Sequence, residues 1–383
     1  MAYPTTRLPR LLISSLALWV GLCATSPLSA LVPLVKGGGV EVRLDATAEA
    51  FIAFDGNRPR HGRIDGRIFD PRHGEFALSD VMFGFEAETA KTSGRIAVWR
   101  GWTPTVIYGG EPAGPIDWSL LQEAWGAVRA TESLTLGAGL FSSPIGLEST
   151  FARDNWCWSS SQLNLAMPFY LTGTRAQLAV DKTTTLEAGL YGGWTRNVAS
   201  NIPSTFVVRV FGAPDWGIWQ VLISGAPTRP GVSVAGVGMA RGWLLDAFFS
   251  APVGGRLELA AQAQLGAETW TRGRRDMALA PWAAATLYAR LALAPHWKAT
   301  ARAEVFWQGG PKQQLAGETL GRLWWPVDTI GAATLSAEWR PTPQFLIRAD
   351  LRMDVADAAM FDVHDGSSTG IRPTASLGVA WTL

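Results

Sequence analysis

The chain has 383 residues, and its 33 Lys and Arg nearly balance 32 Asp and Glu, for a formal net charge of +1. No charge excess therefore points to nucleic acid as a partner. Apolar residues make up 48% of the chain, which is enough to exclude a disordered protein. With two cysteines, a disulfide scaffold and a cysteine-based zinc site are excluded, and we expect neither a metal nor a cofactor.

The first 30 residues have the composition of a cleaved export signal. Arg7 and Arg10 precede an apolar run from Leu11 to Leu22, and the small residue Ala30 offers a cleavage point. The run is about a dozen residues long, whereas a membrane-spanning helix needs ~20. We therefore expect residues 1–30 to be a signal peptide rather than a membrane anchor, and residues 31–383 to be one exported domain.

A period of two dominates the exported part, as is typical of β-strands. In the segment 345–355 one face carries Phe345, Ile347, Ala349, Leu351 and Met353, and the other carries Arg348, Asp350, Arg352 and Asp354. The segments 40–54, 257–268 and 297–307 alternate in the same way. Successive side chains of a strand point to opposite faces, so each segment has one apolar and one charged face.

The length and spacing of these segments favour a membrane barrel over a soluble sandwich. They are about ten residues long, as membrane strands are, whereas strands of soluble proteins have about five or six. Short links near 131–133, 181–184, 212–215, 251–256, 294–296 and 341–343 alternate with long ones near 55–74, 102–119, 142–171, 195–203, 225–240, 270–281, 308–328 and 356–371. We predict an all-β fold, a transmembrane antiparallel up-and-down β-barrel of about 16 strands with short periplasmic turns and long external loops. Fourteen strands are also compatible with the pattern.

Tryptophans lie near the ends of the predicted strands. Trp297 and Trp307 share one face of a segment, and the ~33 Å of strand between them spans about 25 Å of apolar band when tilted. Candidates for the inner aromatic girdle are Trp216, Trp297, Trp339 and Trp381, and those for the outer one are Trp102, Trp194, Trp270 and Trp282. Trp307 is a further girdle candidate. The alternative is that tryptophans fill a core, which does not explain their place at strand ends.

The last residues form a candidate closing strand. Ala375, Leu377, Val379, Trp381 and Leu383 alternate to the end of the chain. Barrel-assembly machinery recognises such strands, although a terminal Phe is more usual than Leu383. Closing the last strand onto the first would remove both sheet edges, which lipid cannot satisfy.

Several motifs between residues 120 and 194 resemble a known family. LLQEAWGAV (120–128), GLFSSPIGLES (139–149), DNW (154–156) and PFYLTGTR (168–175) are similar to the OmpL-like outer-membrane β-barrel porin family, and HGEF (73–76) and YGGW (191–194) resemble it more loosely. The resemblance implies a diffusion channel in the outer membrane of a Gram-negative bacterium. It implies no catalytic residues.

A barrel of this size encloses a water-filled channel whose wall charges set ion preference. The wall candidates include Arg175, Arg302, Glu304, Arg348, Asp350 and Arg352, and the near balance of charges predicts weak selectivity. By analogy with general porins, the link 142–171 after the fifth strand folds inward and Glu148, Arg153 and Asp154 form the constriction. The alternative is a loop that packs on the outer rim or between subunits.

The sequence therefore predicts a porin for passive diffusion of small hydrophilic solutes or ions. Its expected partners are outer-membrane lipid, lipopolysaccharide and the barrel-assembly machinery, with a homotrimer as a further expectation. One alternative is a barrel scaffold for surface binding or adhesion with a plugged lumen. Less favoured are a rim hydrolase using Ser142 or Ser159 with His73, and a calcium site at Asp357, Asp362 and Asp365.

Overall fold

The computed structural model describes residues 32–383 except residues 110, 112–116, 194–204, 227–236, 273–275, 311–312, 316–317 and 322–324. The predicted signal peptide, residues 1–30, and Trp194 lie outside the described residues. Neither helix in the described part, α1 (Trp102–Ile107) or α2 (Gln162–Leu165), has the length and apolarity needed to cross a membrane.

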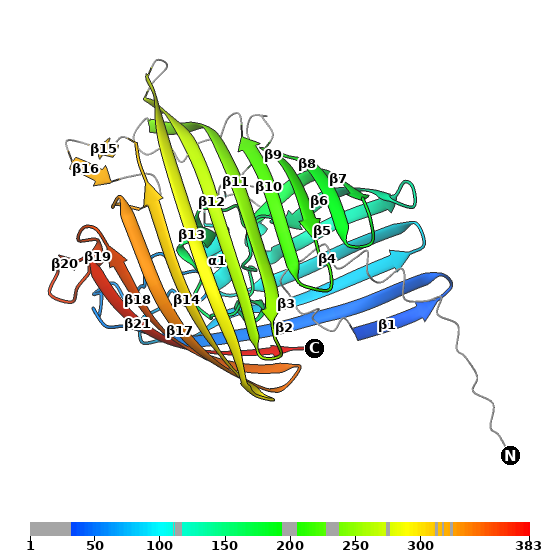
Figure 1. Cartoon of the computed structure of the whole chain (residues 1–383), viewed down its shortest axis with the longest axis horizontal. Helices are drawn as coiled ribbons and strands as arrows, with labels where there is room; N and C mark the ends of the chain where they lie inside the picture. The colour runs from blue at the N-terminus through cyan, green and yellow to red at the C-terminus, as the bar shows by residue number, and fades with distance from the viewer. Residues whose placement is uncertain are drawn as a thin grey trace.

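One antiparallel sheet of 17 strands forms a continuous wall (Figure 1). Strand β1 (Val32–Gly37) pairs only with the beginning of β2 (Val40–Asp55). The remaining 16 strands close into a barrel, because residues 47–55 of β2 pair with residues 374–382 of β21 (Ile371–Thr382). The predicted all-β barrel of about 16 strands is therefore confirmed, whereas the arm β1 was not predicted.

The other strands follow one another along the wall in chain order, each antiparallel to the next. They are β3 (Phe76–Thr89), β4 (Thr92–Arg100), β5 (Leu121–Arg129), β6 (Leu134–Ser142), β7 (Tyr170–Ala179), β8 (Thr184–Tyr191), β9 (Thr205–Gly212), β10 (Ile218–Ala226), β11 (Val237–Val253), β12 (Leu257–Arg272), β13 (Asp276–Ala294), β14 (Trp297–Gln308), β17 (Thr329–Thr342) and β18 (Phe345–Ala356). Two small hairpins lie outside this sheet, β15 (Gln313–Leu315) with β16 (Glu318–Gly321), and β19 (Phe361–Asp362) with β20 (Ser368–Thr369). Two 3₁₀ turns, Trp118–Leu120 and Ala152–Asp154, complete the elements.

The links at one end of the barrel are short, and the C-terminus lies at this end (Figure 1). At the other end they are longer, with one exception. The long link predicted near 270–281 is wrong, because β12 continues to Arg272 and β13 begins at Asp276. Polar residues do not end these two strands, since the backbone ladder continues through pairs such as Thr271 with Met277.

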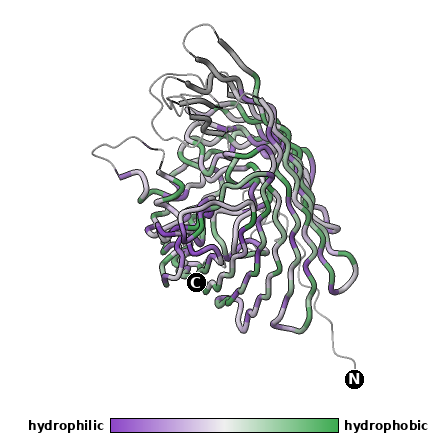
Figure 2. The backbone as a smooth tube through the Cα atoms, turned by 90° about the vertical axis from the view of Figure 1, so that its left-hand side faces the viewer, coloured by the Kyte–Doolittle hydropathy of each residue, from purple (hydrophilic) through white to green (hydrophobic). Residues whose placement is uncertain are grey.

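The period of two places apolar side chains outside and charged side chains inside. On β18, Leu351 is 65% exposed, whereas its neighbours Arg352 and Asp350 are 4% and 2% exposed. Figure 2 shows the same alternation of polar and apolar residues along the strands. The outer surface is thus apolar, and within the described residues no other part of the chain covers it, which is the pattern of a wall facing lipid.

The interior is less polar than the predicted water-filled channel. One apolar cluster joins inward residues of β5 to β17, such as Trp125, Val207 and Phe306, through Leu163 and Met167 of the 143–169 link. On β9 and β10, Val207 and Leu222 point inward into this cluster, beside buried polar residues such as Arg209 and Gln220. The inner face of the wall is therefore polar in part, as expected, and apolar where this cluster packs.

Most of the predicted girdle tryptophans point outward. Trp216, Trp297, Trp307 and Trp381 are 58%, 46%, 46% and 44% exposed, and the rings of Trp297 and Trp339 stack with centroids 6.1 Å apart. Trp102 is 36% exposed, and the side chain of Trp270 is outside the described part. Trp282 was wrongly placed in the outer girdle, because it is 2% exposed and its ring stacks on Phe306 inside the barrel.

Candidate functional site

Residues 143–169, which link β6 to β7, lie inside the barrel; we call them the inner loop. The loop leaves the wall at the end with the long links, where Ser142 pairs with Tyr170. It reaches the end with the short links, where the Nη1 atom of Arg153 donates to Thr382 Oγ1 at 3.3 Å. The inner loop therefore runs along much of the barrel's length.

Carboxylates of the wall hold the backbone amides of the inner loop. Glu49 on β2 accepts hydrogen bonds from the N–H groups of Ala152 and Arg153, at 3.1 and 2.9 Å. Asp350 on β18 accepts from the N–H and the hydroxyl of Ser159, both at 2.9 Å. Hydrogen bonds to a charged acceptor are stronger than neutral ones, so these contacts fix the path of the loop. Wall side chains hold other loop amides in the same way, namely Glu304, Asp246 and Gln262, which accept from Gln162, Gly146 and Leu147.

Arginines of the same wall donate to carbonyl groups of the inner loop. Arg348 Nη1 donates to Ala152 O at 2.7 Å, and Arg352 Nη1 donates to Ser160 O at 2.8 Å. Both arginines also have carboxylate partners on the wall itself. Arg348 lies 2.6 Å from Glu338, and Arg352 lies 2.7 Å from Asp354. Each guanidinium thus joins a strand to the loop without losing its charge partner.

The Trp158 ring packs against the backbone of β21. This side chain is fully buried, and a Cβ atom added to Gly378 would lie 2.0 Å from the Trp158 ring. No real side chain approaches so closely, so only a glycine at position 378 leaves room for the ring. This contact seats the middle of the inner loop on the wall.

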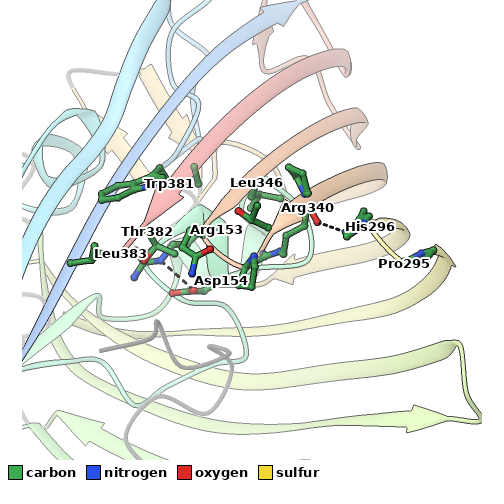
Figure 3. Close-up of a pocket in the computed structure, with 14 residues that line it drawn as sticks. Arg153, Asp154, Pro295, His296, Arg340, Leu346, Trp381, Thr382 and Leu383 are labelled. Atoms are coloured by element: carbon green, nitrogen blue, oxygen red, sulfur yellow. Dashed lines mark hydrogen bonds and ion pairs between the residues drawn. The ribbon is translucent and has the colours of Figure 1, made fainter. Parts of the chain in front are cut away.

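The predicted constriction residues all belong to the inner loop. Glu148 accepts from Arg302 Nη1 at 3.0 Å and from the Tyr288 hydroxyl at 2.8 Å, so it faces wall residues. The Nε of Arg153 lies 3.4 Å from Asp154 Oδ1. Arg153 and Asp154 border a cavity of about 440 Å³ near the short links, together with His296 and Arg340 (Figure 3).

The predicted wall residues are buried against the inner loop. Their exposed fractions do not exceed 7%, and the residues are Arg302, Glu304, Arg348, Asp350 and Arg352. Arg302 also donates to Ser159 O at 2.6 Å and lies 3.2 Å from Glu304, so its charge is balanced locally. Arg175 is on β7, in the opposite part of the wall, and is also 7% exposed.

A second inward segment was not predicted from the sequence. In the link between β2 and β3, Arg67 is 3% exposed and lies 3.5 Å from Asp70 and 3.7 Å from Asp354. Burial lowers the pKa of Arg67 to about 10. The sequence offered one signal for this inward segment, the apolar pair Ile68–Phe69 within a polar link. Both residues are fully buried in the structure.

Cys157 provides a reporter for the position of the inner loop. Its side chain is fully buried, and this burial raises the pKa of the thiol to about 12. Since the thiolate is the reactive form, we expect maleimide to label the folded protein roughly 100-fold more slowly than the urea-unfolded protein at pH 7.5. Mass spectrometry measures the labelled fraction over time, and equally fast labelling of both states would mean that the thiol is accessible.

The side chains of the less favoured alternatives are used in structural hydrogen bonds. The Ser159 hydroxyl donates to Asp350, and His73 Nδ1 accepts from the N–H of Asp55 at 2.9 Å. His61, Asp65 and Asp362 could bring three ligand atoms together, but His61 Nδ1 accepts from Arg63 N at 3.1 Å. The neutral His61 ring then carries its proton on Nε2, which lies 3.0 Å from Asp362. A metal ion would need a lone pair on this same nitrogen, so the hydrogen bonds of His61 do not favour a metal site.

The closed antiparallel barrel with a link folded inside it defines a porin-like barrel. Among solved structures, the outer membrane channel DcaP of Acinetobacter baumannii is similar, with a TM-score of 0.62, 11% identity, and coverage of 92% of this chain and 100% of that one. The anion-selective porin from Comamonas acidovorans has a TM-score of 0.59 and 9% identity, and covers 90% and 100%. The trimer form of OmpT from Vibrio cholerae has a TM-score of 0.56 and 9% identity, and the match covers 90% of this chain and 100% of that one. At these identities the likeness shows the fold alone.

Sequence comparison identifies the family. A family model described as putative beta-barrel porin-2, OmpL-like, matches residues 41–381, and the chain therefore belongs to this family. The resemblance predicted from the motifs between residues 120 and 194 is confirmed. No curated protein matches the chain in sequence.

Proposed function

We propose that the protein is an outer-membrane porin of a Gram-negative bacterium that lets small hydrophilic solutes or ions diffuse through its barrel. The observation that carries this proposal is a closed 16-strand barrel with a loop held inside it by charged groups. A barrel of this size has room for a channel, and a loop across it would set the channel's width. The signal peptide predicted at residues 1–30 and the apolar outer face of the barrel support the same location.

We further propose separate roles for the two groups of predicted site residues. Arg302, Glu304, Arg348, Asp350 and Arg352 are buried under the inner loop and would anchor it. Arg153 and Asp154 border a cavity, so they are better candidates for contact with a passing ion. The aromatic girdle of Trp216, Trp297, Trp307, Trp339 and Trp381 would mark the two edges of the lipid.

Planar-bilayer recording tests the proposed channel. The mature chain, refolded in detergent and verified by circular dichroism, is added to a bilayer in potassium chloride. We expect stepwise insertions with a stable open conductance. Insertion of folded protein without any current would reject the porin and favour the second candidate.

The second candidate is a barrel with a plugged lumen that serves as a surface scaffold. The apolar cluster that joins the inner loop to the wall from β5 to β17 favours it, because hydrated ions do not pass through packed apolar side chains. In that case only variants that displace the inner loop would conduct.

Neutralising Arg153 is expected to shift ion selectivity. In Arg153→Gln, Glu49 and Asp154 lose the positive charge with which they interact. The reversal potential in a tenfold potassium chloride gradient should therefore move toward the equilibrium potential of potassium. A shift of roughly 10 mV or more is expected, which is a modest change in permeability ratio. Arg256→Gln, an exposed change in a short link, is the control for loss of charge. Equal reversal potentials for the two variants would exclude Arg153 from the ion path.

The proposed partners are outer-membrane lipid, lipopolysaccharide, the barrel-assembly machinery acting on β21, and two further copies of the chain. A trimer is supported by the trimer form of the similar OmpT barrel. Native mass spectrometry of the detergent-folded protein gives the subunit number, and a monomer alone would contradict the trimer.

A further inference from the structure

One buried arginine of the lumen wall has no hydrogen-bond acceptor or ion-pair partner among the described residues. Arg175 on β7 is 7% exposed, and the close contacts of its guanidinium are with aromatic rings. The guanidinium carbon lies 3.9 Å from the ring centroid of Phe141 and 5.9 Å from that of Trp125. Its nitrogens are not among the fully enclosed, unpartnered polar atoms of the described part, so solvent reaches them.

This arrangement differs from that of the other buried wall arginines. Arg209 on β9 lies 2.9 Å from Glu187, and Arg352 lies 2.7 Å from Asp354. A guanidinium carries five N–H donors and stays charged, so burying it without an acceptor is costly. An anion from solution would supply the acceptor that the protein does not provide at Arg175.

The neighbouring positions on both sides of Arg175 are glycines. Its register partners are Gly137 on β6 and Gly189 on β8, so no directly adjacent side chain competes for the guanidinium. The Tyr191 hydroxyl lies over Gly189, since a Cβ atom added there would be 2.4 Å from its oxygen. This hydroxyl also has no hydrogen-bond partner within the described chain and is not fully enclosed. The Tyr191 hydroxyl is therefore a second free donor, and it lies over Gly189, the register partner of Arg175.

The carboxylate of Glu187 interacts electrostatically with Arg175, but within the described part its hydrogen bonds and its ion pair are with other residues. Glu187 Oε2 accepts from Arg209 Nη2 at 2.9 Å and from Gln177 Nε2 at 2.8 Å. Two arginines, Arg175 and Arg209, thus share the single negative charge of Glu187, so this group of three residues keeps one positive charge. That charge would attract an anion entering the lumen.

We propose that Arg175, with the Tyr191 hydroxyl, forms a binding site for the carboxylate group of a small organic anion. Stacking on Phe141 occupies one face of the guanidinium and leaves its planar edge for an oxyanion. Two parallel N–H groups on that edge match the two oxygens of a carboxylate. The inference deepens the proposed function, since it names a class of solute for the same lumen.

The binding test uses potassium acetate and does not depend on conduction. Saturation-transfer NMR on the detergent-folded full barrel is expected to show saturable transfer to the acetate methyl group with the wild type. Arg175→Gln should weaken this binding at least tenfold, whereas Arg256→Gln, which removes an equal charge from a short link, should not. Arg175→Lys keeps the charge but not the planar fork, so it should also lose most of the binding.

Two outcomes would overturn the proposal. One is an absence of saturable acetate binding to the folded wild type, and the other is equal binding to the wild type and Arg175→Gln. Acetate binding by a barrel that carries no current would reject the porin and leave the site intact. A conducting barrel without acetate binding at Arg175 would reject the site and leave the porin intact.

Discussion

Removing the inner loop is expected to raise the single-channel conductance by roughly threefold or more, because the loop occupies the lumen of a barrel wide enough for an aqueous channel. Ser142 and Tyr170 are register partners, so residues 144–168 can be replaced by a four-residue Gly-Ser-Asn-Gly turn without displacing β6 or β7. Single-channel recording in planar bilayers measures the change.

The wall should survive this excision, since its arginines have partners of their own. Arg302 lies 3.2 Å from Glu304, and Arg348 and Arg352 keep Glu338 and Asp354. Circular dichroism and resistance to unfolding in cold dodecyl sulfate provide the check that the barrel persists. An intact barrel with unchanged conductance would show that the inner loop is not the constriction. A silent wild type and a conducting excision variant would identify a plugged scaffold.

Replacing Gly378 by alanine is expected to displace Trp158 from the wall. The added Cβ atom would lie 2.0 Å from the Trp158 ring, far inside van der Waals contact, so the ring and the loop around it must shift. Overpacking of a well-packed site typically costs about 1–3 kcal/mol. We expect a lower unfolding temperature, faster maleimide labelling of Cys157 and a higher open conductance.

Two further variants isolate the contact between Gly378 and Trp158. Gly126→Ala is the matched control on a strand, because nothing lies within 4 Å of its added Cβ atom. In the double variant Gly378→Ala with Trp158→Ala the clash is absent, so the stability loss should be smaller than the sum of the two single losses. Additive losses, or Cys157 labelling as slow as in the wild type, would mean that the inner loop is seated without this contact.

Part of the inner loop could be predicted from the sequence by analogy alone. The position of residues 142–171 after the fifth strand led to Glu148, Arg153 and Asp154, and Glu148 does contact wall Arg302 at 3.0 Å. The burial of Arg302 and Arg348 could not be predicted, because residues on the inner face of a strand look alike whether water or a loop covers them. The second inward segment around Arg67 was missed for the same reason.

The aromatic and apolar residues show the same limit. Trp297 and Trp282 both lie near strand ends, but Trp297 points outward and Trp282 points inward onto Phe306. On a strand, a shift of one position exchanges the two faces, so an uncertain boundary is enough to misplace a side chain. The adjacent apolar pair Val207–Val208 breaks the alternation, and this was the signal in the sequence for an apolar inner face.

The sequence by itself determined the all-β barrel of about 16 strands, the closure of β21 onto β2, the outward apolar face and the family. These features depend on a local pattern of period two and on short motifs, which need no knowledge of distant contacts. Only the tertiary structure decided that the inner loop lies inside the lumen, bonded to the wall, and that Arg175 lacks a hydrogen-bond acceptor among the described residues. Those properties depend on residues far apart in the chain, such as Ser159 and Asp350, which are 191 positions apart and meet only when the barrel has closed around the loop.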